Sequence, residues 1–319
     1  IIHHFNKNTC NTNLYLGQMR SKIILLGDSI TQQSFSASLS GWGTYIGDNY
    51  QRRADVYNRG FSGYNTDWFL KYVKTEEGRN DVWGISSRTI ERGETLPSDS
   101  KRQHCIGDVK LVTIFFGAND ASDPIFNPHH HVPLDRFQRN LKEIANLCMA
   151  NFGKDTRILF ISPPPVHHES RLRYQIEKFG EEKATGKLER SLELSGKYAK
   201  AVGAVAKELE LPFLNLWDMI QDSVSPTEKK NEAWSKYLSD GLHLSRDGNL
   251  LVGKLVTETI EKFFPELHVT PCPYTGSTGN SGSSGGIALI SDGGGAGPWH
   301  DEIDHKASDE KFQNWRKSN

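Results

Sequence analysis

The chain has 319 residues, and its 38 Lys and Arg side chains against 39 Asp and Glu give a formal net charge of −1 at pH 7. Without a clustered basic run, nucleic acid is not expected as a partner, because tracking a phosphate backbone requires grouped cations. No stretch approaches the ~20 consecutive apolar residues of a bilayer span, so we expect a cytoplasmic protein without a membrane span.

The first 18 residues are polar and asparagine-rich, and they show no helical or strand period. We expect residues 1–18 to be an unstructured leader, with Met19 as a candidate natural start, and residues 19–268 to form one domain. The four cysteines are far apart and show none of the paired spacings of zinc sites or disulfide scaffolds. Reduced thiols are therefore expected.

Five short apolar runs along the chain indicate buried strands. They are Lys22–Gly27, Ala54–Tyr57, Val109–Phe116, Thr156–Ile161 and Leu211–Leu216. Between them apolar residues recur at helical spacing, most clearly at Leu134, Phe137, Leu141, Ile144 and Leu147. This alternation continues to about His268, and it predicts an α/β fold in which a five-stranded parallel sheet has helices on both faces.

Two segments depart from the alternation. Residues 74–108 are polar and long where a short connection would suffice, which is typical of a lid or of a disordered loop. Residues 274–298 contain nine Gly and five Ser, a composition that cannot bury enough apolar surface to order itself. We therefore expect residues 269–319 to be a flexible tail that ends in a short Trp-containing segment.

Polar residues follow the predicted strands at the edge where reactive groups collect in a parallel sheet. Ser29 follows the first strand, Gly60 the second and Asn119 the third, while Asp240 and His243 precede the last helix. A serine is a weak nucleophile unless a base removes its proton, and a histidine held by a carboxylate is the usual base. The three-residue separation lets a compact loop bring Asp240 to Nδ1 of His243 while Nε2 faces outward.

Attack of Ser29 on an ester would create an oxyanion, which needs fixed hydrogen-bond donors. We expect these donors to be the backbone N–H groups of Ser29 and Gly60 and the side-chain amide of Asn119. Gly60 suits this role because a residue without Cβ permits close approach of the main chain. Asp28 is expected to stabilise the turn beneath Ser29 rather than to react.

Each of these residues has a plainer explanation when it is taken alone. Gly-Asp-Ser is common in turns, Asp240 could cap a helix, and Asn119 and Gly60 could be ordinary turn residues. These plainer explanations do not account for the placement of all of these residues after successive strands. Four aromatic residues near this region are expected to belong to the core rather than to the site: Trp42, Phe61, Tyr64 and Trp68.

Three further motifs are set aside. Residues 282–286 match a nucleophile-elbow pattern, but no strand precedes them. His129–His131 and His167–His168 are expected in solvated loops, since no carboxylate or cysteine cluster accompanies them. We expect neither a metal nor a cofactor.

The ordered blocks Gly27-Asp28-Ser29-Ile30-Thr31, Gly60, Gly117-Ala118-Asn119-Asp120 and Asp240-Gly241-Leu242-His243 resemble those of the GDSL/SGNH hydrolases. Within that superfamily, further segments resemble the branch that hydrolyses isoamyl acetate. They are Gly41-Trp42-Gly43, residues 59–64, His131-Val132-Pro133-Leu134, Ser162-Pro163-Pro164-Pro165 and, near the end, residues 298–301. The resemblance covers about residues 22–268, and the long segment 74–108 departs from it.

The resemblance implies a flavodoxin-like, three-layer α/β/α fold and hydrolysis of small carboxylic esters, acetates or other short-chain esters, without a metal. It also implies a catalytic Ser29, Asp240 and His243, and an oxyanion hole of Ser29, Gly60 and Asn119. Two alternatives stay open: an acyltransferase with the same residues, and a catalytically silent binding scaffold. The expected partner is a small-molecule ester, and the oligomeric state is left open, with a homodimer as one option.

Overall fold

A computed structural model describes residues 20–84, 108–182 and 188–268. All five predicted strands form one parallel sheet in the order β2-β1-β3-β4-β5. Their bounds are β1 (Ser21–Gly27), β2 (Ala54–Gly60), β3 (Val109–Phe115), β4 (Arg157–Ile161) and β5 (Phe213–Leu214). The predicted α/β fold is therefore confirmed.

The strand register brings three chain segments to one edge of the sheet. Gly27, the last residue of β1, pairs with Gly60 on one side and with Phe115 on the other. The residues that follow β1, β2 and β3 thus leave the sheet side by side. This edge carries the side chains that the sequence singled out.

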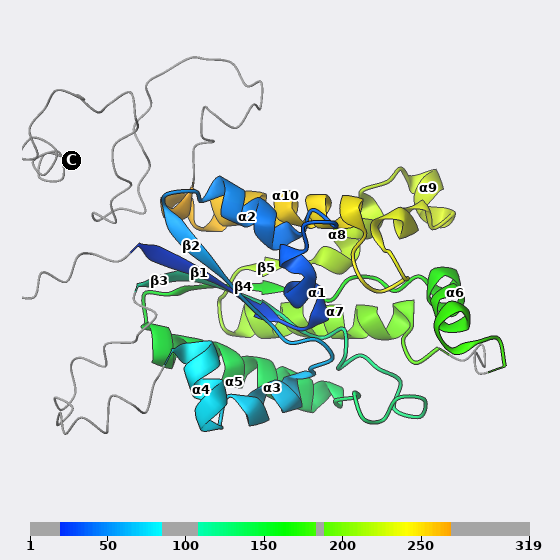
Figure 1. Cartoon of the computed structure of the whole chain (residues 1–319), viewed down its shortest axis with the longest axis horizontal. Coiled ribbons are helices and arrows are strands. Elements are labelled where there is room, and N and C mark those ends of the chain that lie inside the picture. Colours follow the sequence, from blue (N-terminus) through cyan, green and yellow to red (C-terminus); the bar gives the residue numbers. More distant parts are fainter. Residues whose placement is uncertain (1–19, 85–107, 183–187, 269–319) are drawn as a thin grey trace, which may run out of the picture.

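Helices cover both faces of the sheet (Figure 1). One face carries α2 (Trp42–Asn49), α8 (Leu216–Asp222) and α10 (Arg246–Phe263). The other face carries α3 (Thr66–Tyr72), α4 (Glu76–Trp83), α5 (Leu134–Phe152) and α7 (Leu192–Glu208). The remaining helical segments are α1 (Ser29–Gln32), η1 (Gln33–Phe35), α6 (His168–Phe179), α9 (Pro226–Lys230), η3 (Ala233–Tyr237) and η4 (Pro265–Leu267).

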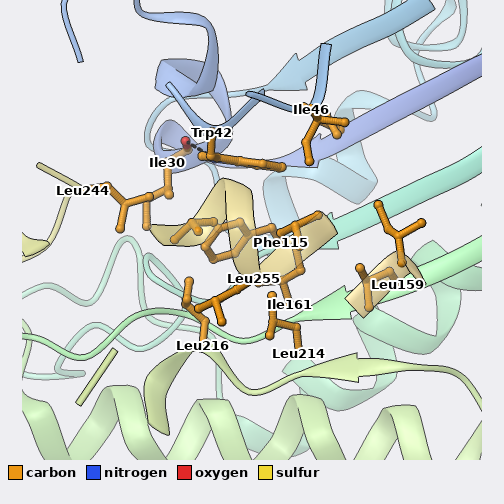
Figure 2. Packing of buried hydrophobic residues seen from close by; sticks show 14 of the residues in the cluster. Ile30, Trp42, Ile46, Phe115, Leu159, Ile161, Leu214, Leu216, Leu244 and Leu255 are labelled. Atoms are coloured by element: carbon orange, nitrogen blue, oxygen red, sulfur yellow. Dashed lines mark hydrogen bonds between the residues drawn. The ribbon is translucent and has the colours of Figure 1, made fainter. Parts of the chain in front are cut away.

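Each face of the sheet has its own apolar core, as expected for a sheet buried on both sides. In the first core, Trp42 of α2 packs against Phe115 of β3 with ring centroids 6.0 Å apart, close to Leu255 of α10 (Figure 2). In the second, Phe137 of α5 packs against Tyr198 of α7.

Part of the segment expected as a long loop is helical. Residues 74–108 begin with α4, whose Val82 and Trp83 are buried against the second core. The Thr75 hydroxyl caps this helix, which ends at Gly84 in the left-handed region. Residues 85–107, the leader 1–18, the tail 269–319 and the motif at 282–286 lie outside the described residues, so the predictions for them stay predictions.

Among the described residues, no helix is long and apolar enough to cross a membrane. Cys148, the cysteine that these residues include, is a free thiol buried in α5.

Candidate active site

Ser29 stands at the first position of α1, directly after β1 ends. Asp28 caps this helix, since its Oδ1 accepts a hydrogen bond from the Ile30 N–H at 2.9 Å, as the sequence predicted. The first N–H groups of a helix have no partner within it, so the Ser29 amide is free of intrahelical bonding. Burial raises the pKa of Asp28 to about 6, against the lowering effect of its bond from Ile30.

Gly60 seats α1 on the end of β2. A Cβ at this position would lie 2.0 Å from the Gln32 nitrogen and 2.6 Å from the Thr31 carbonyl carbon, both main-chain atoms of α1. Asn58 ties the same elements together, because its Nδ2 donates to the carbonyls of Thr31 and Gln32 at 2.9 and 3.1 Å. The glycine is therefore required for the position of the helix that carries Ser29.

The Asp240–His243 loop is held by its own carboxylate. Oδ1 of Asp240 accepts the N–H groups of Leu242 and His243 at 3.0 and 2.7 Å. Gly241 has a φ of +79°, and a Cβ there would lie 2.5 Å from the Arg171 nitrogen at the start of α6. The loop is thus both turned on itself and docked against α6.

The two segments meet through a chain of hydrogen bonds. Ser29 Oγ lies 2.9 Å from His243 Nε2, and His243 Nδ1 lies 2.9 Å from Asp240 Oδ2. Burial alone would raise the pKa of Asp240, but the hydrogen bond from His243, the imidazole charge and the Arg171 guanidinium lower that pKa to well below its usual range. Asp240 is therefore a carboxylate at neutral pH, and it can hold an imidazolium.

Asn119 comes to the same edge from the end of β3. Its side chain is 5 % exposed, its Nδ2 donates to the Tyr64 carbonyl at 2.9 Å, and its Oδ1 accepts from Arg190 at 2.9 Å. An amide nitrogen carries two protons, so one remains for another acceptor. The structure brings Asn119 and Ser29 to the same edge of the sheet, as the sequence predicted.

The Gly60 amide is engaged in this structure. It donates to Asn58 Oδ1 at 2.9 Å, across the start of the turn after β2. A single N–H that is shared between two acceptors binds each of them more weakly. The Gly60 N–H already has an acceptor, which distinguishes it from the Ser29 N–H and the second Nδ2 proton of Asn119. The interaction depends on Asn58, which the sequence analysis did not single out.

Three charged residues around the site were also not predicted. Arg171 donates to Asp240 Oδ2 at 3.0 Å, and Glu189 bridges Arg171 and Arg190 at 2.7 and 2.8 Å. These side chains come from α6 and from the segment before α7, and no spacing in the sequence connects them. The sequence offered only a weak signal for these residues. They are charged side chains near predicted helix ends, and such side chains are usually exposed to solvent.

The histidine pairs differ in their surroundings. His167 is not in a solvated loop as expected: it caps α6, is 8 % exposed, and its Nε2 lies 3.1 Å from Glu232. Its ring also packs edge-on against Trp234. His130 and His131 lie in the loop between β3 and α5, where they bond to Asn127 and to the Ser122 carbonyl.

The aromatic residues belong mainly to the core, as expected. Trp42 is fully buried and donates to the Ile30 carbonyl at 3.2 Å, and Phe61 and Tyr64 pack against the second core. Trp68 differs, since it is only half-buried and packs against the tilted ring of His130 with centroids 5.1 Å apart. It stands in α3, four residues beyond Tyr64, whose carbonyl holds Asn119.

A serine, a histidine and a carboxylate thus meet at the carboxyl edge of a parallel α/β sheet, an arrangement that is typical of hydrolases with a serine hydroxyl at the site. The model of the GDSL-like lipase/acylhydrolase family matches residues 25–251. The chain belongs to this family, and it is a carboxylic ester hydrolase.

Curated relatives cover most of the domain. A GDSL esterase/lipase from Arabidopsis thaliana is 39 % identical over 76 % of this chain and 87 % of its own length. Isoamyl acetate-hydrolyzing esterase 1 homologs from Rattus norvegicus and Homo sapiens are 38 % and 36 % identical, over 72 % and 76 % of this chain and 76 % and 82 % of their own lengths. The resemblance to the isoamyl acetate-hydrolysing branch is thereby confirmed.

Solved structures agree on the fold. A lipase/acylhydrolase from Enterococcus faecalis matches with a TM-score of 0.50 at 24 % identity, over 80 % of this chain and 99 % of that one. A putative GDSL-like lipase from Parabacteroides merdae matches with a TM-score of 0.51 at 13 % identity, over 76 % and 96 %. At these identities the likeness concerns the fold alone.

Proposed function

We propose that the protein hydrolyses small carboxylic esters, with acetyl or other short acyl groups, through an acyl-enzyme on Ser29. The observation that carries this proposal is the contact of Ser29 Oγ with His243 Nε2 at 2.9 Å, with Asp240 bound to the other ring nitrogen. A hydroxyl in such a chain can lose its proton as it attacks.

In the first half of the reaction, Ser29 Oγ bonds to the ester carbonyl carbon while its proton passes to His243 Nε2. The carboxylate of Asp240 stabilises the imidazolium that forms. The tetrahedral intermediate then releases the alcohol, which takes the proton back from Nε2, and the acyl group stays on Ser29. In the second half, a water oxygen bonds to the acyl carbon while one water proton passes to His243 Nε2. The bond between the acyl carbon and Ser29 Oγ then breaks, Oγ takes the proton from Nε2, and the acid leaves.

The oxyanion of each intermediate needs fixed donors. The Ser29 N–H at the start of α1 and the second Nδ2 proton of Asn119 supply two of them. The Gly60 N–H becomes the third if the oxyanion draws it away from Asn58 Oδ1, since a charged acceptor makes a stronger hydrogen bond than an amide oxygen. The positive first turn of α1 adds to the stabilisation only weakly, because the helix is a single turn.

The preference for short acyl groups rests on the relatives that are named isoamyl acetate-hydrolyzing esterase 1 homologs. Trp68 and its neighbour His130 are the half-buried rings next to the Tyr64–Asn119 contact, and we propose that they line one side of the ester. Aromatic faces suit the short hydrocarbon chains of such substrates.

The test is hydrolysis of para-nitrophenyl acetate, butyrate and octanoate by the wild type and by Ser29→Ala. We expect the acetate to be preferred and the variant to retain only background hydrolysis, with His243→Ala losing on the order of 10⁶-fold in kcat. Equal hydrolysis by Ser29→Ala would overturn the mechanism. Adding a competing alcohol separates the two fates of the acyl group, since an acyltransferase would form a new ester at the expense of free acid.

A further inference from the structure

A chain of four buried charges connects the Asp240 side of the site with the Asn119 side. Asp240 Oδ2 accepts from Arg171 at 3.0 Å, Arg171 and Arg190 both donate to Glu189 Oε1 at 2.7 and 2.8 Å, and Arg190 donates to Asn119 Oδ1 at 2.9 Å. The side chains of these charged residues are only 7–15 % exposed. Two guanidinium groups and two carboxylates leave the chain neutral.

Such a chain is costly to bury, and a buried ion pair is weak evidence for stability, because desolvation offsets the attraction. Burial lowers the pKa of Arg190, and the neighbouring Glu189 opposes that effect. Burial would also raise the pKa of Glu189, but hydrogen bonding from Arg171 and the charges of both arginines bring it below its usual value. Glu189 is therefore a carboxylate between the two guanidinium groups, and the arrangement calls for another role than stability.

The contact of Arg190 with Asn119 decides which way the amide faces. A guanidinium only donates and a main-chain carbonyl only accepts, so Arg190 selects the Oδ1 side of the amide and the Tyr64 carbonyl selects the Nδ2 side. A flipped amide would set NH₂ against the guanidinium and Oδ1 against the carbonyl. In addition, Arg190 Nε donates to the Ala118 carbonyl at 3.0 Å, which fixes the main chain next to Asn119.

We propose that Arg190 is a positioning residue for ester hydrolysis. It holds the Asn119 amide with its remaining N–H toward the oxyanion, and through its charge it makes that N–H a stronger donor. Glu189 and Arg171 anchor Arg190 to Asp240, so the base and the oxyanion donor are held by one network. This inference rests on the proposed role of Asn119 in the hydrolysis.

The test is a double-mutant cycle on kcat per active site, with Arg190→Met and Asn119→Ala, where active sites are counted by titration of Ser29. We expect Asn119→Ala to lower kcat by about 10²- to 10³-fold. Arg190→Met should lower kcat by about 10- to 100-fold with KM unchanged, because an interaction made only in the transition state affects kcat. When Asn119→Ala is already present, adding Arg190→Met should lower kcat by less than about threefold, since no amide remains to be held.

Two further variants separate positioning from folding. Arg190→Lys keeps the charge but replaces the planar guanidinium fork with a single ammonium, so we expect it to recover part of kcat. The same cycle can be run with this variant if Arg190→Met does not fold. Arg157→Met removes an ion pair with Glu266 at the opposite edge of the sheet and should keep the wild-type kcat. A purely structural role for Arg190 would instead lower the number of titrated sites and the melting temperature, with full kcat per site.

The outcomes are distinguishable. Suppose that Asn119→Ala is slow. If Arg190→Met then has the wild-type kcat, or loses the same factor in kcat with and without Asn119→Ala, this inference is overturned and the proposed hydrolysis stands. Wild-type kcat for Asn119→Ala would overturn the oxyanion assignment and the inference with it. Turnover by Ser29→Ala would overturn the hydrolytic mechanism itself.

Discussion

Ser29 and His243 are 214 positions apart in the chain, yet Ser29 Oγ lies 2.9 Å from His243 Nε2. The contact forms because α1 begins where β1 ends and the loop before α10 returns to the same edge of the sheet. The Asp240 carboxylate closes that loop through two main-chain N–H groups before it reaches the imidazole. One side chain thus shapes the loop and orients the ring.

Replacing Asp240 with Asn should lower kcat by about 10⁴-fold, as expected when the orienting carboxylate of a serine–histidine pair becomes an amide. If the amide Nδ2 of Asn faced His243 Nδ1, the ring proton would move from Nδ1 to Nε2. A protonated Nε2 cannot accept the proton of Ser29. Steady-state kinetics measures the effect. Asp247→Asn, on the exposed first turn of α10, is the matched control and should keep full activity. More than a tenth of wild-type turnover for Asp240→Asn would contradict this role.

Gly60→Ala should destabilise the fold by about 1–3 kcal/mol, the usual range for forcing an extra methyl group into a packed site. The new Cβ would meet the main chain of α1 at 2.0 Å, so Ser29 must move and activity should fall with stability. Gly47→Ala in α2 is the control: nothing lies within 4 Å of its Cβ, and alanine favours a helix. Urea unfolding of both variants checks this, and a Gly60→Ala protein as stable as the wild type would be the contrary result.

Asp120 should make the folded protein less stable as pH rises from about 4 to 7. Burial raises its pKa to about 7, against two hydrogen bonds from Thr66, so the folded state binds more protons than the unfolded state in this range. Stability then falls with pH, by at most about 1.4 kcal/mol per pH unit. Among the described residues, its Oδ2 has no hydrogen-bond partner.

Asp120→Asn keeps an acceptor for Thr66 and removes the charge, so its stability relative to the wild type should increase between pH 5 and pH 8. Asp28, whose pKa is raised to about 6, also lowers the free energy of unfolding as pH rises. The difference between the two proteins removes this contribution, because both contain Asp28. Asp155→Asn, on the exposed turn before β4, controls for the loss of one negative charge. If the difference in unfolding free energy is constant across this pH range, Asp120 does not titrate as described.

The sheet could be predicted because parallel strands buried on both faces are nearly continuous apolar runs, which Val109–Phe115 and Arg157–Ile161 show clearly. The end of the run Ser21–Gly27 indicated where Ser29 would lie, and the end of Val109–Phe115 indicated where Asn119 would lie. Weakly periodic elements were harder to predict, since α6 is largely polar and α4 buries only a few side chains.

The surroundings of the site could not be predicted in the same way. Arg171, Glu189 and Arg190 meet through tertiary contacts that leave no period in the sequence, and charged residues are usually exposed. The bond from the Gly60 amide to Asn58 Oδ1 depends on a side-chain rotation that no spacing encodes. The sequence therefore indicated which side chains meet Ser29 better than it indicated the residues that hold those side chains in place.

We propose that Ser29 is an activated nucleophile, and labelling with a fluorophosphonate probe tests this role most directly. The measurement is intact mass followed by peptide mapping of the wild type, Ser29→Ala, His243→Ala and the exposed control Ser38→Ala. We predict one adduct per chain on Ser29 in the wild type and in Ser38→Ala, and none in the other two within the same time. An adduct on another residue, or equal labelling of Ser29→Ala, would contradict the account.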